Sequence, residues 1–241
     1  MRGPNLNLKS HITDRVVKRQ PGHVWAPVDF LDLGPRDAVD KALQRLVAAG
    51  HLRRIDRGLY DQARQNALTG KSTSPDYRSV IDAASRRDQV RVLIDGISAA
   101  NDLGLTDAVP AQVVVHTDGR LRPIQLGNLT IQFKVTAASK LYWAGRPGMR
   151  VVQALHWLRD SLPQNRDVVT ARLLRMLKNN DTDVKIRDDL RQGLYTLPAW
   201  MQDFLRTLLR LADSKADTTG SAAKHASRVA TPAQMNHGAM E

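Results

Sequence analysis

Residues 34–61 read GPRDAVDKALQRLVAAGHLRRIDRGLYD, a stretch in which apolar and basic side chains follow a regular pattern. Apolar side chains recur in its first half at three- and four-residue spacing, which predicts an amphipathic helix over 35–49. Proline suits the start of a helix and glycine its end, so Pro35 and Gly50 bound this helix. Two short strand-like runs on either side of Gly58 then predict a β-hairpin.

The residues before this helix complete a small unit. Ser10 is expected to cap an amphipathic helix, because its hydroxyl can accept a hydrogen bond from an unpaired amide, and Pro21-Gly22 stops that helix. The short apolar stretch 25–33 follows. Helix, short helix, helix and basic hairpin is the order of a winged helix-turn-helix, which we therefore predict over 10–61.

The remainder of the chain predicts a second unit of mixed structure. Residues 62–75 are polar and rich in turn-forming residues, so we expect a linker there. Residues 76–212 are expected to form an α+β domain for interaction. Apolar side chains nearly vanish from 213–241, and such a segment cannot bury enough surface to offset chain entropy, so we expect a flexible tail. The elements expected in the second unit are helix 76–87, strand 90–94, helix 98–103, strands 112–116 and 129–135, two helices after Gly148, and helices 184–194 and 199–211.

The predicted fold class is therefore α+β: an N-terminal winged helix-turn-helix followed by a mixed α/β domain with a helical C-terminal part. The 241 residues include 36 Lys and Arg against 24 Asp and Glu, a net charge of +12. The surplus is densest in residues 1–60, where 11 basic side chains stand against 6 acidic ones. A basic patch in a small N-terminal unit is the electrostatic pattern of a nucleic-acid contact.

Composition also excludes several classes of site. The chain has no cysteine, which excludes disulfides, thiol nucleophiles and Cys-ligated metal centres. No apolar run approaches about 18 residues, so we expect no membrane-spanning helix. The first ten residues lack the apolar core of a signal peptide, so we expect a cytoplasmic protein.

Candidate DNA-contacting residues follow from the predicted fold. The second helix of the motif enters the major groove, where arginine pairs with guanine and glutamine with adenine. The hairpin adds further cations, and a wing with glycine at its tip can reach phosphate or a minor groove without steric obstruction. We expect Tyr60 in the core, with a hydroxyl that could reach a phosphate. The candidate residues are Arg36, Lys41, Gln44, Arg45, Arg53, Arg54, Arg57, Gly58 and Tyr60.

A plainer interpretation of the same pattern is a solvated charged helix beside a basic hairpin, or a module that binds protein. Motifs for catalysis are incomplete. Gly70-Lys71-Ser72 lacks the upstream glycine of a phosphate-binding loop, because Gln65 stands there, and Ala100 replaces the second glycine of a nucleophile elbow. No two of the seven histidines lie four residues apart. We therefore predict no catalytic residue, metal site or cofactor, and do not expect an enzyme.

The quoted N-terminal stretch resembles the winged-helix segment of AbiEi-type antitoxins of bacterial type IV toxin–antitoxin systems. Two further segments are similar to the domain that follows it in that family: DGISAANDLGLTDAVPAQVVVHTDGRLR over 95–122 and GRPGMRVVQALHWLRD over 145–160. The resemblance covers residues 11–160. It departs at Pro35, where the family often has Ser or Thr.

The resemblance implies a DNA-binding antitoxin that represses its own operon by binding inverted repeats in double-stranded DNA. It also implies that the C-terminal domain opposes a nucleotidyltransferase-like toxin. An alternative is a protein-interaction module, or an enzyme that acts on the toxin through its second domain while the winged helix serves as a docking surface. The oligomeric state stays open, since inverted repeats suit two copies on DNA but no heptad seam indicates a preformed dimer.

Overall fold

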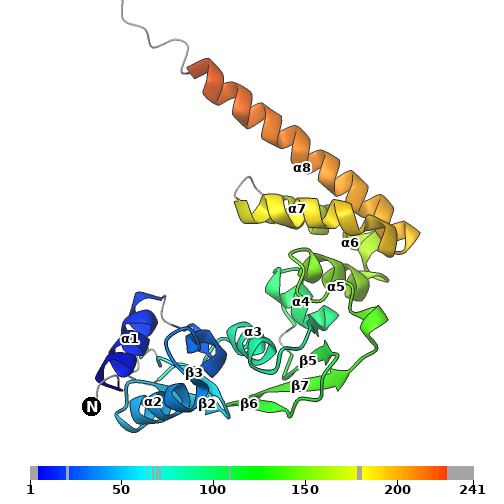
Figure 1. Ribbon diagram of the computed structural model, residues 1–241. Helices are drawn as coiled ribbons and strands as arrows, with labels where there is room; N and C mark the ends of the chain where they lie inside the picture. Colours follow the sequence, from blue (N-terminus) through cyan, green and yellow to red (C-terminus); the bar gives the residue numbers. More distant parts are fainter. Residues whose placement is uncertain are drawn as a thin grey trace, which may run out of the picture.

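The computed structural model describes residues 5–19, 22–63, 65–66, 68, 70, 72–108, 110–177 and 181–226, and the fold class is α+β as predicted. Two small sheets lie in separate parts of the chain (Figure 1). We call the part from α1 to β3 the N-terminal unit, and the part from α3 to α8 the C-terminal unit.

The N-terminal unit contains two helices, a short 3₁₀ helix and a three-stranded antiparallel sheet in the order β1-β3-β2. The predicted helix over 35–49 and the hairpin after it are both present. The elements of this unit, in chain order, are α1 (Asn5–Lys18), β1 (Val24–Trp25), η1 (Pro27–Phe30), α2 (Arg36–Ala48), β2 (Arg53–Asp56) and β3 (Leu59–Asp61).

A separate apolar core holds α1 and α2 together. Ile12, Phe30 and Leu43 are fully buried in it, and the Trp25 ring lies 5.0 Å from that of Phe30. The prediction that Ser10 caps α1 is wrong, because the helix already begins at Asn5. Leu8, four residues before Ile12, is buried in the same core, so the apolar stripe of α1 extends further back than expected.

The C-terminal unit begins with a helix and a four-stranded mixed sheet in the order β4-β5-β7-β6. Strand β5 pairs parallel to β7, whereas the two outer pairings are antiparallel. The helices and strands expected in this region are present, with β6 in addition. They are α3 (Tyr77–Asp88), β4 (Val92–Ile94), α4 (Gly96–Asp102), β5 (Gln112–Thr117), β6 (Ile124–Leu126), β7 (Leu129–Val135), η2 (Ala138–Lys140) and α5 (Met149–Leu158).

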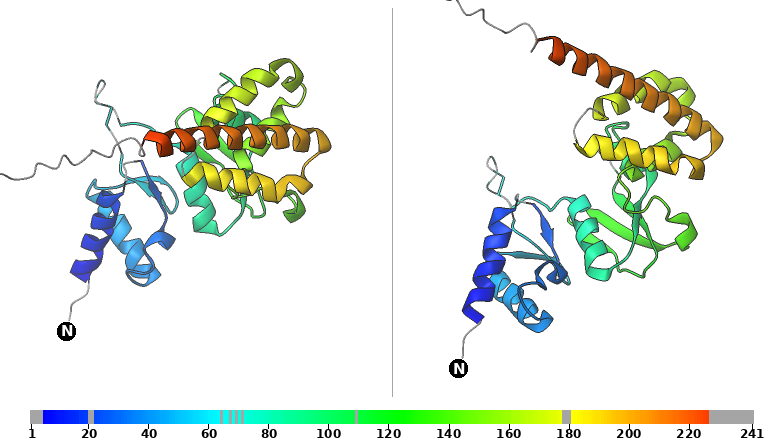
Figure 2. Two further views of the ribbon diagram at one scale, coloured as in Figure 1. Left: turned by 90° about the horizontal axis from the view of Figure 1, so that it is seen from above. Right: turned by 45° about the horizontal axis from the view of Figure 1, so that its top comes forward.

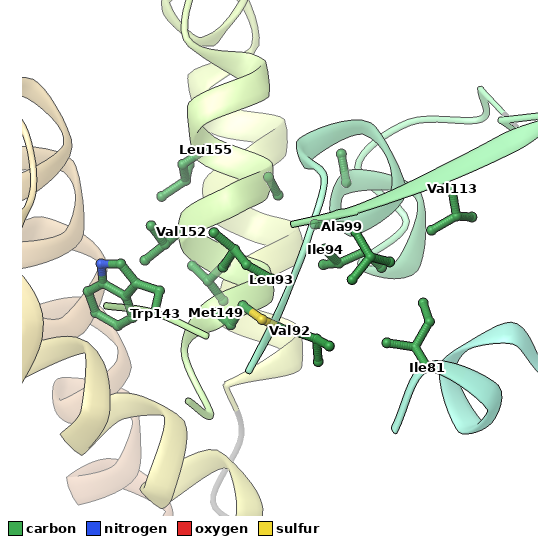
Figure 3. Close-up of a cluster of buried hydrophobic side chains, with 14 of the residues drawn as sticks. Ile81, Val92, Leu93, Ile94, Ala99, Val113, Trp143, Met149, Val152 and Leu155 are labelled. Atoms are coloured by element: carbon green, nitrogen blue, oxygen red, sulfur yellow. The ribbon is translucent and has the colours of Figure 1, made fainter. Parts of the chain in front are cut away.

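Helices α4 and α5 pack closely against each other beside this sheet. A Cβ atom at Gly96 would lie 2.6 Å from the Cβ of Trp157 and 2.8 Å from the carbonyl oxygen of Gln153, so only glycine permits this approach. Figure 3 shows Leu93 of β4 facing Val152 and Met149 of α5 across the resulting core.

Three further helices follow: α6 (Leu162–Met176), α7 (Asp181–Gly193) and, after η3 (Leu194–Thr196), α8 (Ala199–Ala226). Helix α8 packs against α6 and α7, and its far end runs beyond them (Figures 1 and 2). The chain is thus still helical after residue 213, where we expected a tail to begin. Asp213 pairs there with Arg191 of α7 at 2.7 Å. The rest of the expected tail, 227–241, lies outside the described residues.

Helix α3 lies between the two sheets and joins the units (Figure 1). Val24 and Leu59 of the N-terminal sheet belong to the same buried cluster as Val80 and Ala84 of α3. At the end of the helix, the Arg86 guanidinium donates to both carboxylate oxygens of Asp29, at 2.9 and 3.1 Å. We call these contacts of α3 with the N-terminal unit the α3 junction. Because of this junction, the expected linker 62–75 does not leave the two units independent.

The carboxylate of Asp102 fixes the other end of α3. It accepts hydrogen bonds from the Tyr77 hydroxyl, from Arg78 at 2.5 Å and from Arg150 of α5 at 3.1 Å. Its side chain is only 2% exposed. Burial alone would raise the pKa of Asp102, but the hydrogen bonds from Arg78 and Tyr77 outweigh it and lower that pKa.

We expect Asp102→Asn to lower the free energy of unfolding at pH 7 by about 2 kcal/mol. The substitution removes the negative charge that Arg78 and Arg150 share, but both arginines stay partly exposed to solvent. A carboxyl whose pKa is lowered by folding stabilises the native state above its unfolded pKa of about 3.9, and this stabilisation disappears as pH falls through the folded pKa. Urea denaturation should therefore show the difference between the proteins shrinking below about pH 4.

The matched control is Asp188→Asn, which removes the carboxylate of an exposed ion pair with Arg191. It should change the unfolding free energy by no more than about 0.5 kcal/mol. Equal effects of the two substitutions would contradict the role assigned to Asp102.

Candidate nucleic-acid interface

Helix α2 presents a polar face that the described residues leave exposed to solvent. Val39, Leu43 and Leu46 are buried on its inner side. At about 100° of rotation per residue, Lys41 and Gln44 lie opposite these residues. Both are exposed. Their side chains are therefore accessible and point the same way, as the sequence predicted.

Arg36 and Arg45 flank this face on opposite sides, about 180° apart around the helix axis. Both are exposed. Nε of Arg36 lies 2.9 Å from a carboxylate oxygen of Asp40 one turn later. Such a solvent-exposed pair contributes about 0.5 kcal/mol or less, so a ligand can replace it at small cost. Pro35, at the N-cap, offers no side-chain hydrogen bond to the first turn.

Strand β2 follows α2 after a short connection. Arg54 is exposed on it and stands opposite Tyr60 in the ladder. Tyr60 is only 6% exposed and packs in the core of the N-terminal unit, as expected. Burial raises the pKa of its hydroxyl, while the charge of Arg54 acts to lower it, that of Asp40 to raise it and that of Arg36 to lower it. Tyr60 therefore belongs to the core that supports this part of the unit.

Arg53 does not fit the role expected from the sequence. Its guanidinium donates to both carboxylate oxygens of Asp61, at 3.0 and 2.6 Å, and to Ser72 and the carbonyl oxygen of Thr73. The Asp61 side chain is 2% exposed, and its hydrogen bond raises the pKa of Arg53. Four of the five N–H groups of this guanidinium therefore donate hydrogen bonds within the protein, so Arg53 stabilises the hairpin.

The turn between β2 and β3 also differs from expectation, because its tip is not free of neighbours. Gly58 has a φ of +69°, which favours glycine, and a Cβ atom there would lie 3.1 Å from Cδ of Arg87 in α3. The Arg87 guanidinium donates to the carbonyl oxygen of Arg57 at 2.5 Å. The side chain of Arg57 stays exposed, but the backbone of the turn is held by α3.

The expected set of residues therefore divides in two. The exposed members are Arg36, Lys41, Gln44, Arg45, Arg54 and Arg57. The members that shape the unit are Arg53, Gly58 and Tyr60. The sequence interpretation missed Arg86 and Arg87. The only signal for them was the pair of basic residues in the last turn of an expected helix, where cations commonly favour the helix dipole.

A cleft of about 860 Å³ opens on another side of the N-terminal unit, between α1, β1 and α3. None of the expected DNA-contacting residues lines it. Two of its cations, Arg15 and Arg86, already pair with Asp32 and Asp29. Among the described residues, no three His, Asp or Glu side chains are grouped to hold a metal ion, and no helix is long and apolar enough to cross a membrane.

The family model described as "Family of unknown function (DUF6088)" matches residues 11–186, well over half of the chain. The chain belongs to this family. The match runs from α1 into α7, so the DUF6088 region includes both units and the α3 junction. No curated protein matches the chain.

Within this DUF6088 chain, we expect Arg53→Ala to act on stability. It leaves the buried carboxylate of Asp61 without its cation, which should lower the unfolding free energy by about 2 kcal/mol. Arg54→Ala, one residue later and exposed, should change it by no more than about 0.5 kcal/mol. Urea denaturation followed by circular dichroism measures both. A larger loss for Arg54→Ala would show that the two arginines have been assigned the wrong way round.

Proposed function

We propose that this DUF6088 chain is a sequence-specific DNA-binding protein whose N-terminal unit is a winged helix-turn-helix. Two observations support it: Lys41 and Gln44 are exposed on the outer face of α2, and Arg36 and Arg54 are exposed close enough to Tyr60 for their charges to act on its hydroxyl. The order of elements, with a helix, a strand, a short helix, a second helix and a two-stranded hairpin, agrees with this proposal. Helix α2 would be the helix that enters the major groove.

The chemistry of this surface separates base contacts from phosphate contacts. Gln44 can pair with adenine through two hydrogen bonds, and Arg36 with guanine once it leaves Asp40. Lys41 offers a single mobile ammonium group, which suits a phosphate. Arg54 and Arg57 extend from the hairpin and would contact the backbone beside the groove. Base identity would thus be read mainly from α2, and position fixed by the hairpin.

The charge of the molecule supports the same proposal. A net charge of +12 attracts a polyanion over long range, and each cation placed on a phosphate releases a counterion. Binding is therefore expected to weaken as salt concentration rises. Helix α2 itself carries Arg36, Lys41 and Arg45 against Asp37 and Asp40, so most of the surplus charge that attracts DNA lies elsewhere in the chain.

We further propose, on the resemblance to AbiEi-type antitoxins, that the chain is a cytoplasmic antitoxin that represses its own operon. Its operator would be an inverted repeat in double-stranded DNA, bound by two copies. The C-terminal unit would then oppose a nucleotidyltransferase-like toxin encoded next to it. Growth of cells that express the adjacent gene, with and without this chain, tests the antitoxin role separately from DNA binding.

Fluorescence anisotropy with labelled DNA from upstream of the gene tests the DNA-binding proposal. The chain should bind this duplex more tightly than a scrambled duplex of equal length. Gln44→Ala should reduce the difference in binding free energy between the two duplexes by about 1–3 kcal/mol, because the side chain that contacts one base pair is removed. Lys41→Ala should weaken binding to both duplexes equally and reduce the number of counterions released on binding by about one.

Arg210→Ala, which replaces an exposed residue on α8, serves as the control and should leave the affinity for both duplexes unchanged. Equal affinity of the wild-type chain for the upstream and scrambled duplexes would refute sequence-specific recognition.

A further inference from the structure

A second exposed surface lies far from α2, in the C-terminal unit. A cleft of about 470 Å³ opens between the end of α5, the outer face of α6 and the turn after α4. Its walls include Leu158 and Val169, which are buried, and two apolar side chains that are not: Trp157 is 44% and Val168 is 71% exposed. Large apolar side chains exposed next to one another in a cleft are typical of a binding surface.

The spacing along α6 gives this cleft a direction. Asn165, Val168, Arg172 and Arg175 follow one another at three- and four-residue intervals, so they share one face of the helix. Trp157 at the end of α5 lies beside this face. The cleft therefore offers an apolar end at Trp157 and Val168 and a cationic end at Arg172 and Arg175.

The cationic end is not neutralised from within the described part of the chain. The Arg172 guanidinium donates to the carbonyl oxygen of Leu103 at 3.3 Å and lies over Gly104, and that of Arg175 donates to a carbonyl oxygen of its own helix at 3.4 Å. Neither arginine has an ion-pair partner among the described residues, whereas several other arginines pair with aspartates. None of the residues that line the cleft is acidic.

We propose that this cleft binds an acidic amphipathic helix of another protein. Apolar side chains of that helix would cover Trp157 and Val168, and its carboxylates would pair with Arg172 and Arg175. A helix laid in a groove with anchors at three- and four-residue spacing matches both the apolar rim and the repeat along α6. Duplex DNA fits less well, because its phosphates gain nothing from Trp157 and Val168. The proposal does not depend on DNA binding by the N-terminal unit.

The test uses the full chain and a series of fluorescein-labelled helical peptides of about fifteen residues. All carry leucine at the same positions, and their charged positions change stepwise from glutamate to lysine. Affinity measured by anisotropy should rise with acidic charge, with the most acidic peptide bound at least about tenfold more tightly than the most basic one. An absence of this preference would overturn the proposal.

The variants locate the binding. The double substitution Arg172→Glu/Arg175→Glu should remove the preference for acidic peptides. Val168→Asp should lower the affinity for the most acidic peptide about tenfold. Arg120→Glu/Arg122→Glu makes the same change of net charge in the exposed loop between β5 and β6, and should leave the preference in place. If both double variants lose it equally, the attraction is to the overall charge and the cleft is not the site.

Two further measurements decide between occupants. Sedimentation of the chain alone should give the same mass for the wild type and for Val168→Asp; a dimer that Val168→Asp dissociates would assign the cleft to a second copy instead. Binding of a scrambled duplex should be weakened no more by Arg172→Glu/Arg175→Glu than by the control double variant. A selective loss would assign the cleft to DNA and overturn the proposal.

Discussion

Helix α3 is held at both ends by carboxylates from different parts of the chain, and the arrangement of the two units depends on this. At its start, Tyr77 and Arg78 bind Asp102 of the C-terminal unit; at its end, Arg86 binds Asp29 of the N-terminal unit. Apolar residues between these two ends are buried against the N-terminal sheet. Because the hydrogen bonds and the buried surface lie on one rigid helix, neither unit can shift without breaking contacts at the other.

This arrangement also accounts for the shape of the proposed interface. Arg87 occupies the space above Gly58 and binds the carbonyl of Arg57, so the hairpin turn is fixed from behind. Arg53 and Asp61 fix the other end of the hairpin. With these groups engaged inside the protein, the surface left for a ligand consists of the outer face of α2, Arg54 and the side chain of Arg57.

Much of the fold could be predicted from local patterns. Apolar spacing located α2 within a residue at each end, and turn residues located the hairpin and most strands of the second sheet. The errors have different origins. Ser10 has the chemistry of a cap, but Leu8, four residues before Ile12, continues the buried apolar stripe, so periodicity could have extended the helix. Asp213, the first residue of the expected tail, forms an ion pair with Arg191 of α7, and periodicity carries no information about such a contact between distant residues.

The same limit applies to the candidate site. Exposure of Lys41 and Gln44 follows from helix periodicity and could be predicted. The role of Arg53 could not, because a basic residue in a short strand has the same pattern whether it faces solvent or a buried Asp61. Helix periodicity distinguishes Val169, four residues before the buried Leu173, from Val168, four residues before Arg172. The cleft beside α6 could not be predicted, because it also requires Trp157 and the turn after α4 to lie next to this helix.

The α3 junction has one more consequence, for two copies that meet on a symmetric DNA site. A DNA-binding domain on a flexible linker can adjust to half-sites at different separations. In the proposed complex the α3 junction would hold each N-terminal unit against its own C-terminal unit. The distance and angle between the two N-terminal units would then depend on how the two C-terminal units pack together. The loss of affinity caused by one base pair inserted between the half-sites would then report on the stiffness of α3.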